Sequence, residues 1–398
     1  MRHPGQPHPS APSAVPSPLS IALAGLSALA IAVGVGRFAF PPLLAMMVTD
    51  EALSVADGGW LASANYLAYL GGALAAIRIK VNSAMAIRFS LLLVALSTVA
   101  MGWGNSFPVW LVLRVIAGLA SAWTFVFVSS WALTWVRNLG RPNLDGVLYT
   151  GVGTGIVLSG LLCLAFMDQG VHWPAAWLIF GALALAGTLA LWRIVSLDPV
   201  ASAPLQPART RSPIDRRSAW IMVSAYGIAA MGYAIPATFL PVLARDAIAN
   251  PNVFGWLWPA FGAAATVSTL AAAAPSRSLQ ARGLWISASF VMAIGVIVAA
   301  LWPGLAGLAV AALCVGGTFM VITMAGMQVA KAIGGADARS LIAAMTASFA
   351  AGQILGPAVA TAMLQAGGSI AEALLAAGLL LVISAFALRA LPLSAMKG

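Results

Sequence analysis

The chain has 398 residues, of which 61% are apolar and 8% are charged, and its mean hydropathy is +0.97. Soluble domains carry about 25% charged residues, so this composition excludes a soluble globule. The amount of apolar sequence also excludes intrinsic disorder and a single membrane anchor. Lysine and arginine total 20 against 10 acidic residues, which gives a net charge of +10. In a membrane protein, the distribution of these basic residues among the loops predicts which side of the bilayer each loop faces. We expect no nucleic-acid partner.

Beyond a flexible, proline-rich tail at residues 1–19, the sequence contains twelve apolar stretches long enough to cross a membrane. The first is too long for the apolar region of a cleaved signal peptide, so we expect it to be retained. A membrane helix needs about 20 apolar residues. This length predicts an all-α membrane protein with transmembrane helices at 20–47, 56–77, 86–104, 108–135, 146–167, 174–195, 218–242, 253–274, 284–302, 305–331, 341–365 and 370–391.

One long polar connection, residues 196–217, separates the sixth and seventh stretches and is rich in proline and arginine. It predicts a linker between an N-terminal six-helix bundle at 20–195 and a C-terminal six-helix bundle at 218–392, which a short tail at 393–398 follows. With the N-terminus inside, 17 of the 20 basic residues fall on the inner side. The positive-inside rule therefore places both termini, the tails and the linker in the cytoplasm.

The two halves of the sequence repeat. An offset of 196 residues relates Gly36 to Gly232, Trp60 to Trp256 and Gly160 to Gly356, and it relates the span starts in the same way. Six crossings per half is an even number, so the repeats run parallel and are related by an axis along the membrane normal.

Twelve spans, a basic central linker and a parallel repeat resemble the major facilitator superfamily. Arg114-Val-Ile-Ala-Gly118 resembles that superfamily's fourth-helix motif, and Gly151-Val-Gly-Thr-Gly155 resembles its glycine-rich hinge motif. The segment Gly72-Ala-Leu-Ala-Ala76 departs from the pattern, since alanine replaces the usual aspartate. The segments at 34–42, 59–67 and 232–241 are similar to the YbfB/YjiJ-type bacterial branch of the superfamily.

This resemblance implies the major facilitator fold, in which two parallel six-helix bundles surround a central cavity lined by the first, fourth, seventh and tenth helices. It also implies a secondary transporter that works by alternating access in the bacterial cytoplasmic (inner) membrane. The sequence contains no nucleotide-binding P-loop, so we do not expect ATP to drive it directly.

Two arginines, Arg37 and Arg114, lie inside predicted spans, at roughly 15 Å and 9 Å from the outer surface. Charge is expensive inside a membrane and marks a functional site by default. We hypothesise that both bind an anionic group of the substrate, a carboxylate, which a guanidinium holds through two parallel hydrogen bonds. The alternative is structural: Arg37 snorkels toward the membrane surface or pairs with Asp50 or Glu51, and Arg114 binds neighbouring backbone carbonyls.

Other polar side chains on the expected cavity helices complete the predicted substrate-binding set. They are Asn65, Tyr66, Tyr226, Tyr233, Gln328 and Gln353. The alternative for each of them is a hydrogen bond between helices.

The first and seventh spans also carry prolines, and a proline leaves the carbonyl four residues earlier without its partner. Pro41 and Pro42 are expected to free the carbonyls of Arg37 and Phe38, and Pro236 and Pro241 those of Gly232 and Ala237. Such paired interruptions indicate a transporter site, and the alternative is a bend for packing. Small-residue faces in the fifth and eleventh spans predict surfaces that slide during transport, or static close packing: Gly151, Gly155, Gly160, Gly352 and Gly356.

We expect no metal, no cofactor and no enzymatic activity. Cys163 and Cys314 lie in apolar runs, the histidines are scattered, and no catalytic cluster is visible. The leading interpretation is a monomeric carrier of a small organic anion, with protons or a counter-anion as the coupling partner. The alternatives are a proton-coupled exporter of neutral or lipophilic drug-like compounds and a membrane sensor that does not transport.

Overall fold

The computed structural model describes residues 16–79, 81–104, 106–196, 215–247, 255–273, 280–302 and 304–391, without the side chains at 55–56, 142, 196, 240–247 and 336. These residues form helices and no strand. Eleven helices among them are long and apolar enough to cross a membrane, and the helix Leu257–Ala273 is a shorter apolar one. The prediction of an all-α membrane protein with twelve helices is confirmed.

The first half contains six membrane segments, and the first of them is broken. It consists of α1 (Pro18–Leu29), the π-helix η1 (Ala30–Phe38) and α2 (Phe40–Thr49). The others are α3 (Val55–Arg78), α4 (Ser83–Met101), α5 (Phe107–Asn138), α6 (Asp145–Asp168) and α7 (Trp173–Leu191).

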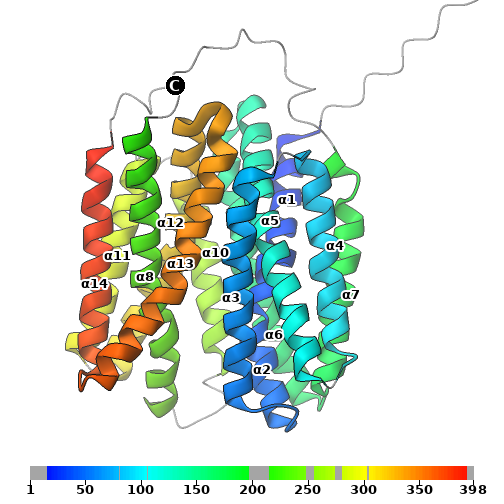
Figure 1. Cartoon of the computed structure of the whole chain (residues 1–398), viewed down its shortest axis with the longest axis vertical. Coiled ribbons are helices and arrows are strands. Elements are labelled where there is room, and N and C mark those ends of the chain that lie inside the picture. Colours follow the sequence, from blue (N-terminus) through cyan, green and yellow to red (C-terminus); the bar gives the residue numbers. More distant parts are fainter. Residues whose placement is uncertain are drawn as a thin grey trace, which may run out of the picture.

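The second half follows the same order. Its helices are α8 (Arg216–Ala247), α10 (Leu257–Ala273), α11 (Ala281–Leu301), α12 (Leu305–Gly334), α13 (Ala338–Gln365) and α14 (Ile370–Ala387). Figure 1 shows the helices of the two halves as two groups side by side, blue to green-cyan in one and green to red in the other. We call the end at which α7 stops and α8 starts the linker end, and the end that carries the turn between α2 and α3 the opposite end.

The π-helix in the first segment has a local cause. The Ala39 N–H donates to the carbonyl of Gly34, five residues earlier, at 2.8 Å. Pro41 and Pro42 then begin α2, where a missing N–H is tolerated. The regular α-helical hydrogen-bond pattern of the first segment is therefore interrupted between Ala30 and Ala39.

The most extensive contacts between the two halves are made by two helix pairs. In one, α6 packs on α10: a Cβ atom at Gly153 would lie 2.8 Å from the Thr266 nitrogen, and one at Gly160 would lie 2.7 Å from the Pro259 ring. In the other, α3 meets α13 through small and aromatic side chains, namely Tyr69, Ala73, Ala347 and Ala350. In Figure 1, α13 lies against α3 near the linker end and bends away from it toward the opposite end, and Pro357 lies inside α13.

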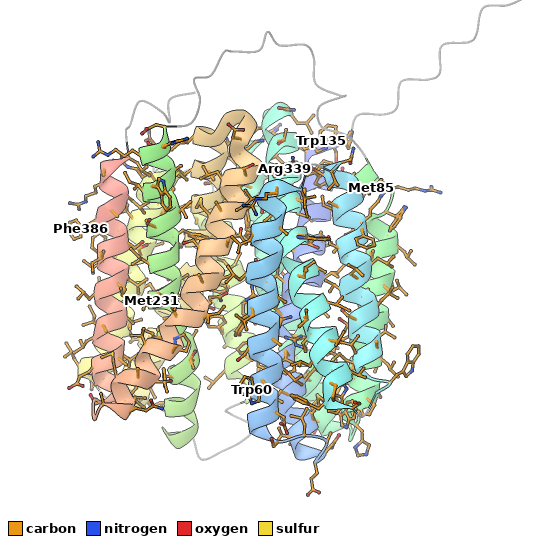
Figure 2. All side chains as sticks on the ribbon, viewed as in Figure 1. Trp60, Met85, Trp135, Met231, Arg339 and Phe386 are labelled. Carbon is orange, nitrogen blue, oxygen red and sulfur yellow. The ribbon has the colours of Figure 1, made fainter. Side chains whose placement is uncertain are left out.

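The glycines predicted to form one sliding surface have different partners. Gly160 does face the other half, but Gly151 and Gly155 face the first segment, where a Cβ at Gly155 would lie 2.6 Å from the Gly34 Cα. Gly352 and Gly356 face α8 of their own half, and Met231, whose carbonyl approaches Gly356, lies where α8 and α13 cross in Figure 2. Of the five, Gly160 alone therefore lies where a surface could slide between the halves, and the other four make close contacts within their own half, as the alternative of static close packing expects.

The contact between Gly34 and Gly155 predicts a strong effect of one methyl group. We expect Gly155→Ala to lower the free energy of unfolding by about 1–3 kcal/mol, because the new Cβ would overlap backbone atoms that cannot rotate away. Gly59→Ala is the matched control, since a Cβ at Gly59 has no atom within 4 Å. Thermal unfolding of the two purified variants measures the difference, and equal melting temperatures would contradict this account of the packing.

Candidate functional site

Arg37 lies at the end of η1 and is 6% exposed. Its Nη2 atom donates to Gln353 Oε1 of α13 at 3.0 Å, so its side chain reaches from one half to the other. Its Cζ atom lies 3.9 Å from the centre of the Tyr69 ring and 5.2 Å from that of Tyr66. Its Nε atom has no hydrogen-bond partner among the described residues, so the guanidinium retains binding capacity.

Arg114 in α5 is 3% exposed and has a backbone partner. Its Nη1 atom donates to the carbonyl of Gly36 at 3.1 Å, and its Cζ atom lies 4.2 Å from the centre of the Phe40 ring. The i→i−5 pattern of η1, if continued, would pair the Gly36 carbonyl with Pro41, whose nitrogen has no hydrogen. In an α-helix, Pro41 would leave the carbonyl of Arg37 without a partner. In the π-helical pattern it leaves the carbonyl of Gly36, and this is the carbonyl that Arg114 binds.

Arg37 lines two cavities at the same time. The central cavity has a volume of about 30 Å³ and the second cavity, toward the opposite end, about 480 Å³. Arg114 and Tyr66 line the second cavity with it, next to Pro41 and Thr238. The prediction that the two arginines share a cavity agrees with this geometry.

No carboxylate among the described side chains forms an ion pair with either arginine. Asp50, the acid considered for Arg37, instead accepts from the backbone N–H of Trp173 at 3.0 Å and lies 3.3 Å from His172 Nδ1. Aromatic faces and neutral oxygens are the nearby groups, and these offset part of the cost of burying a cation without neutralising it.

The central cavity has a largely aromatic wall. Tyr226 and Tyr233 line it as predicted; the Tyr226 hydroxyl donates to Thr323 Oγ1 at 3.1 Å, and the Tyr233 ring stacks on Phe319 with centroids 5.4 Å apart. Sequence reasoning missed the other aromatic members of the wall, which are Phe38, Tyr69, Phe125, Phe319 and Phe349. Tyr69 lies one helical turn after Tyr66 and so on the same side of α3, and this spacing could have identified it from the sequence.

Two predicted lining residues lie elsewhere. Asn65 is fully buried against α5, where its Nδ2 atom donates to the carbonyl of Arg114 at 3.0 Å, and it lines neither cavity. Gln328 lies toward the linker end, where its carbonyl accepts from Arg137 Nη2 at 3.2 Å. Both make the interhelical contacts that were the alternative, because their positions on α3 and α12 face a neighbouring helix.

The prolines of the first segment accompany a break in the helix, whereas those of α8 do not. The Phe38 carbonyl, which Pro42 was expected to free, accepts from Trp258 Nε1 of α10 at 3.1 Å and so links the halves. The second half contains no matching break among its described residues, since α8 is helical through both Pro236 and Pro241. The side chain of Pro241 lies outside the described part.

This chain matches one protein-family model and is similar in fold to a solved membrane transporter. The family model described as "Uncharacterised MFS-type transporter YbfB", in which MFS denotes the major facilitator superfamily, matches residues 29–389. No curated protein sequence matches significantly. The crystal structure of the human organic anion transporter MFSD10 (TETRAN) is similar with a TM-score of 0.73 at 14% identity, over 94% of this chain and 100% of that one.

The different partners of the two arginines predict different effects on stability. We expect Arg114→Gln to lower the free energy of unfolding by about 1–3 kcal/mol, because the Gly36 carbonyl would lose its donor inside the bundle. Arg37→Gln should change it by less than about 1 kcal/mol, since the loss of one hydrogen bond is offset by the removal of a buried charge. Thermal unfolding in detergent compares the two, and an equal or larger loss for Arg37→Gln would contradict the assignment.

Proposed function

The chain belongs to the YbfB-type family of major facilitator superfamily transporters, and from this membership we propose that it moves a small organic anion across the membrane by alternating access. One observation carries the choice of substrate class: Arg37 is a buried cation between two cavities, without an acidic partner among the described residues. An anion supplies the charge that this site lacks.

The chemistry of the site favours a carboxylate with an apolar body. A guanidinium stays charged at every physiological pH and matches two carboxylate oxygens. Around it, the rings of Tyr66, Tyr69 and Phe38 form an apolar surface beside the charge. A lipophilic cation is disfavoured, because like charges repel strongly where water is excluded. MFSD10, whose fold this chain shares, is itself named an organic anion transporter.

We infer that the anion competes with Gln353 for Arg37. The hydrogen bond from Arg37 to Gln353 joins the first segment to α13, so an anion that displaces Gln353 would also break a contact between the halves. Binding would then change the balance between two packings of the halves, as alternating access requires. Arg114 contributes positive charge to the second cavity and keeps the broken segment in place.

The distribution of basic residues bears on the orientation of the protein in the membrane. We propose that the protein resides in a bacterial cytoplasmic membrane as a monomer, with the linker end and both termini in the cytoplasm, because the basic residues gather at that end. The second cavity then faces the periplasm, and protons or a counter-anion supply the driving force.

Replacement of Arg37 tests the substrate class. We expect wild-type protein in proteoliposomes to exchange labelled benzoate, or another acid from a panel of monocarboxylates, and to leave neutral benzamide and tetraphenylphosphonium untransported. Arg37→Gln should weaken binding of the acid about 10- to 150-fold, the equivalent of one lost charge-assisted interaction of about 1.5–3 kcal/mol. Counterflow of the label and ligand-induced thermal shifts are the measurements.

Two variants serve as controls. Arg37→Lys keeps the charge without the planar pair of donors and should fall between wild type and Arg37→Gln. Arg88→Gln should transport normally, because Arg88 binds the carbonyl of Trp192 and lines neither cavity. Full activity of Arg37→Gln, or preferential transport of tetraphenylphosphonium or benzamide, would refute the anion proposal and favour the drug exporter. The absence of any transport would favour the sensor.

A further inference from the structure

Asp145 is the only buried acidic side chain among the residues that the structure describes. It is the first residue of α6, a position normally exposed to water, yet it is 1% exposed. Its Oδ1 atom has no hydrogen-bond partner among the described residues. A carboxylate in such a place is expensive when charged, so its burial needs an explanation.

The neighbours of Asp145 come from both halves of the molecule. Arg137 near the end of α5 acts on it electrostatically, and Gln328 of α12 contacts its carboxyl group. On its own helix the next titratable group is Tyr149, one turn further along. From α10, the side chain of Ala273 packs against the adjacent Gly146, so an apolar group is the described neighbour on this side. Asp145 thus lies in the contact between α6 and α12, where the halves meet.

Further polar contacts close this same end of the molecule. Arg137 Nη2 donates to the Gln328 carbonyl at 3.2 Å, and Lys331 Nζ donates to Thr134 Oγ1 at 2.5 Å. Arg339 Nη1 donates to the carbonyl of Val81 at 3.2 Å, and Figure 2 shows Arg339 at the linker end, where α13 meets the first half. Every one of these contacts joins the first half to the second, so they must break if the linker end opens.

Asp145 also connects to the central cavity. Tyr149 interacts electrostatically with Asp145 on one side and with Tyr226 on the other. Tyr226 lines the cavity and binds Thr323, and Val152, on the same helix as Tyr149, lines it too. Tyr149 therefore acts electrostatically on both the buried carboxyl and a cavity-lining residue, and its own hydroxyl has no hydrogen-bond partner among the described residues.

We propose that Asp145 is a proton-binding site that controls opening of the linker end. When this end is closed, burial favours the neutral carboxylic acid. When it opens, the carboxyl gains water, loses Gln328 and releases its proton to the solvent on that side. One proton binds and one proton leaves per cycle, and Asp145 is neutral in the closed state and charged in the open one. The proposal uses alternating access from the proposed function but not the anionic substrate.

Thermodynamic linkage fixes the direction of the effect. The closed state binds the additional proton, so a rise in pH favours the open linker end. One titrating group changes the ratio of open to closed molecules by at most tenfold per pH unit. Arg137 acts against protonation by favouring the carboxylate, so a closed state that keeps Asp145 ionised would show no such dependence.

Distances across the linker end test the proposal without any substrate. Spin labels at Met85→Cys and Gln280→Cys, in a background with Cys163→Ala and Cys314→Ala, report the separation of the halves by electron–electron resonance. Both residues are exposed at the linker end, where Met85 lies in the first turn of α4 and Gln280 is the residue that precedes α11. We expect the long-distance population to rise between pH 5 and pH 8.5, and Asp145→Asn, which is permanently neutral, to keep the closed distribution throughout.

Asp168→Asn is the matched control, because Asp168 is exposed at the other end of the same helix, and it should titrate like the wild type. Asp145→Glu should titrate with a displaced midpoint, and this variant decides the question if Asp145→Asn is not monodisperse. A pH-independent wild type, an unchanged titration in Asp145→Asn, or an unmoved midpoint in Asp145→Glu would each overturn the proposal. Failure of anion transport leaves this readout unaffected, so the two proposals can fail separately.

Discussion

Burial of positive charge in an apolar bundle is the constraint on which the centre of this molecule depends. A guanidinium removed from water needs other groups to offset the lost hydration. Here those groups are ring faces and neutral oxygens: the Gly36 carbonyl and the Phe40 ring for Arg114, and Gln353 with the Tyr69 ring for Arg37. Both charges are retained, but neither is neutralised by an acid among the described residues.

The backbone of the first segment is adapted to this arrangement. A regular α-helix offers few free carbonyls, whereas a π-helix followed by two prolines exposes several in one place. Arg114 and Trp258 each use one, and these two bonds come from different halves of the molecule. The broken segment therefore supplies carbonyls both to the contact between the halves and to the site. Because Gly34 and Gly155 have no side chains, this segment can lie close to α6.

The two ends of the molecule differ in their chemistry. At the linker end, side chains of α5, α6, α12 and α13 form polar contacts between the halves, with Asp145 buried among them. Toward the opposite end, α13 bends away from α3 (Figure 1). The second cavity lies beside the two arginines. The cations at the centre and Asp145, the one buried acid among the described side chains, are thus separate elements, and Tyr149 interacts electrostatically with both Asp145 and the cavity-lining Tyr226.

The sequence by itself determined the class, the helices and their number, because a membrane span needs a long apolar stretch that is readable residue by residue. It also identified Arg37 and Arg114, since charge within such a stretch stands out. Only the tertiary structure decided that Asn65 and Gln328 face other helices, that Gly151 and Gly155 pack within their own half, and that Asp145 is buried. Which side of a helix meets which neighbour depends on rotation and crossing of whole helices, and uniformly apolar helices carry little amphipathic pattern to encode it.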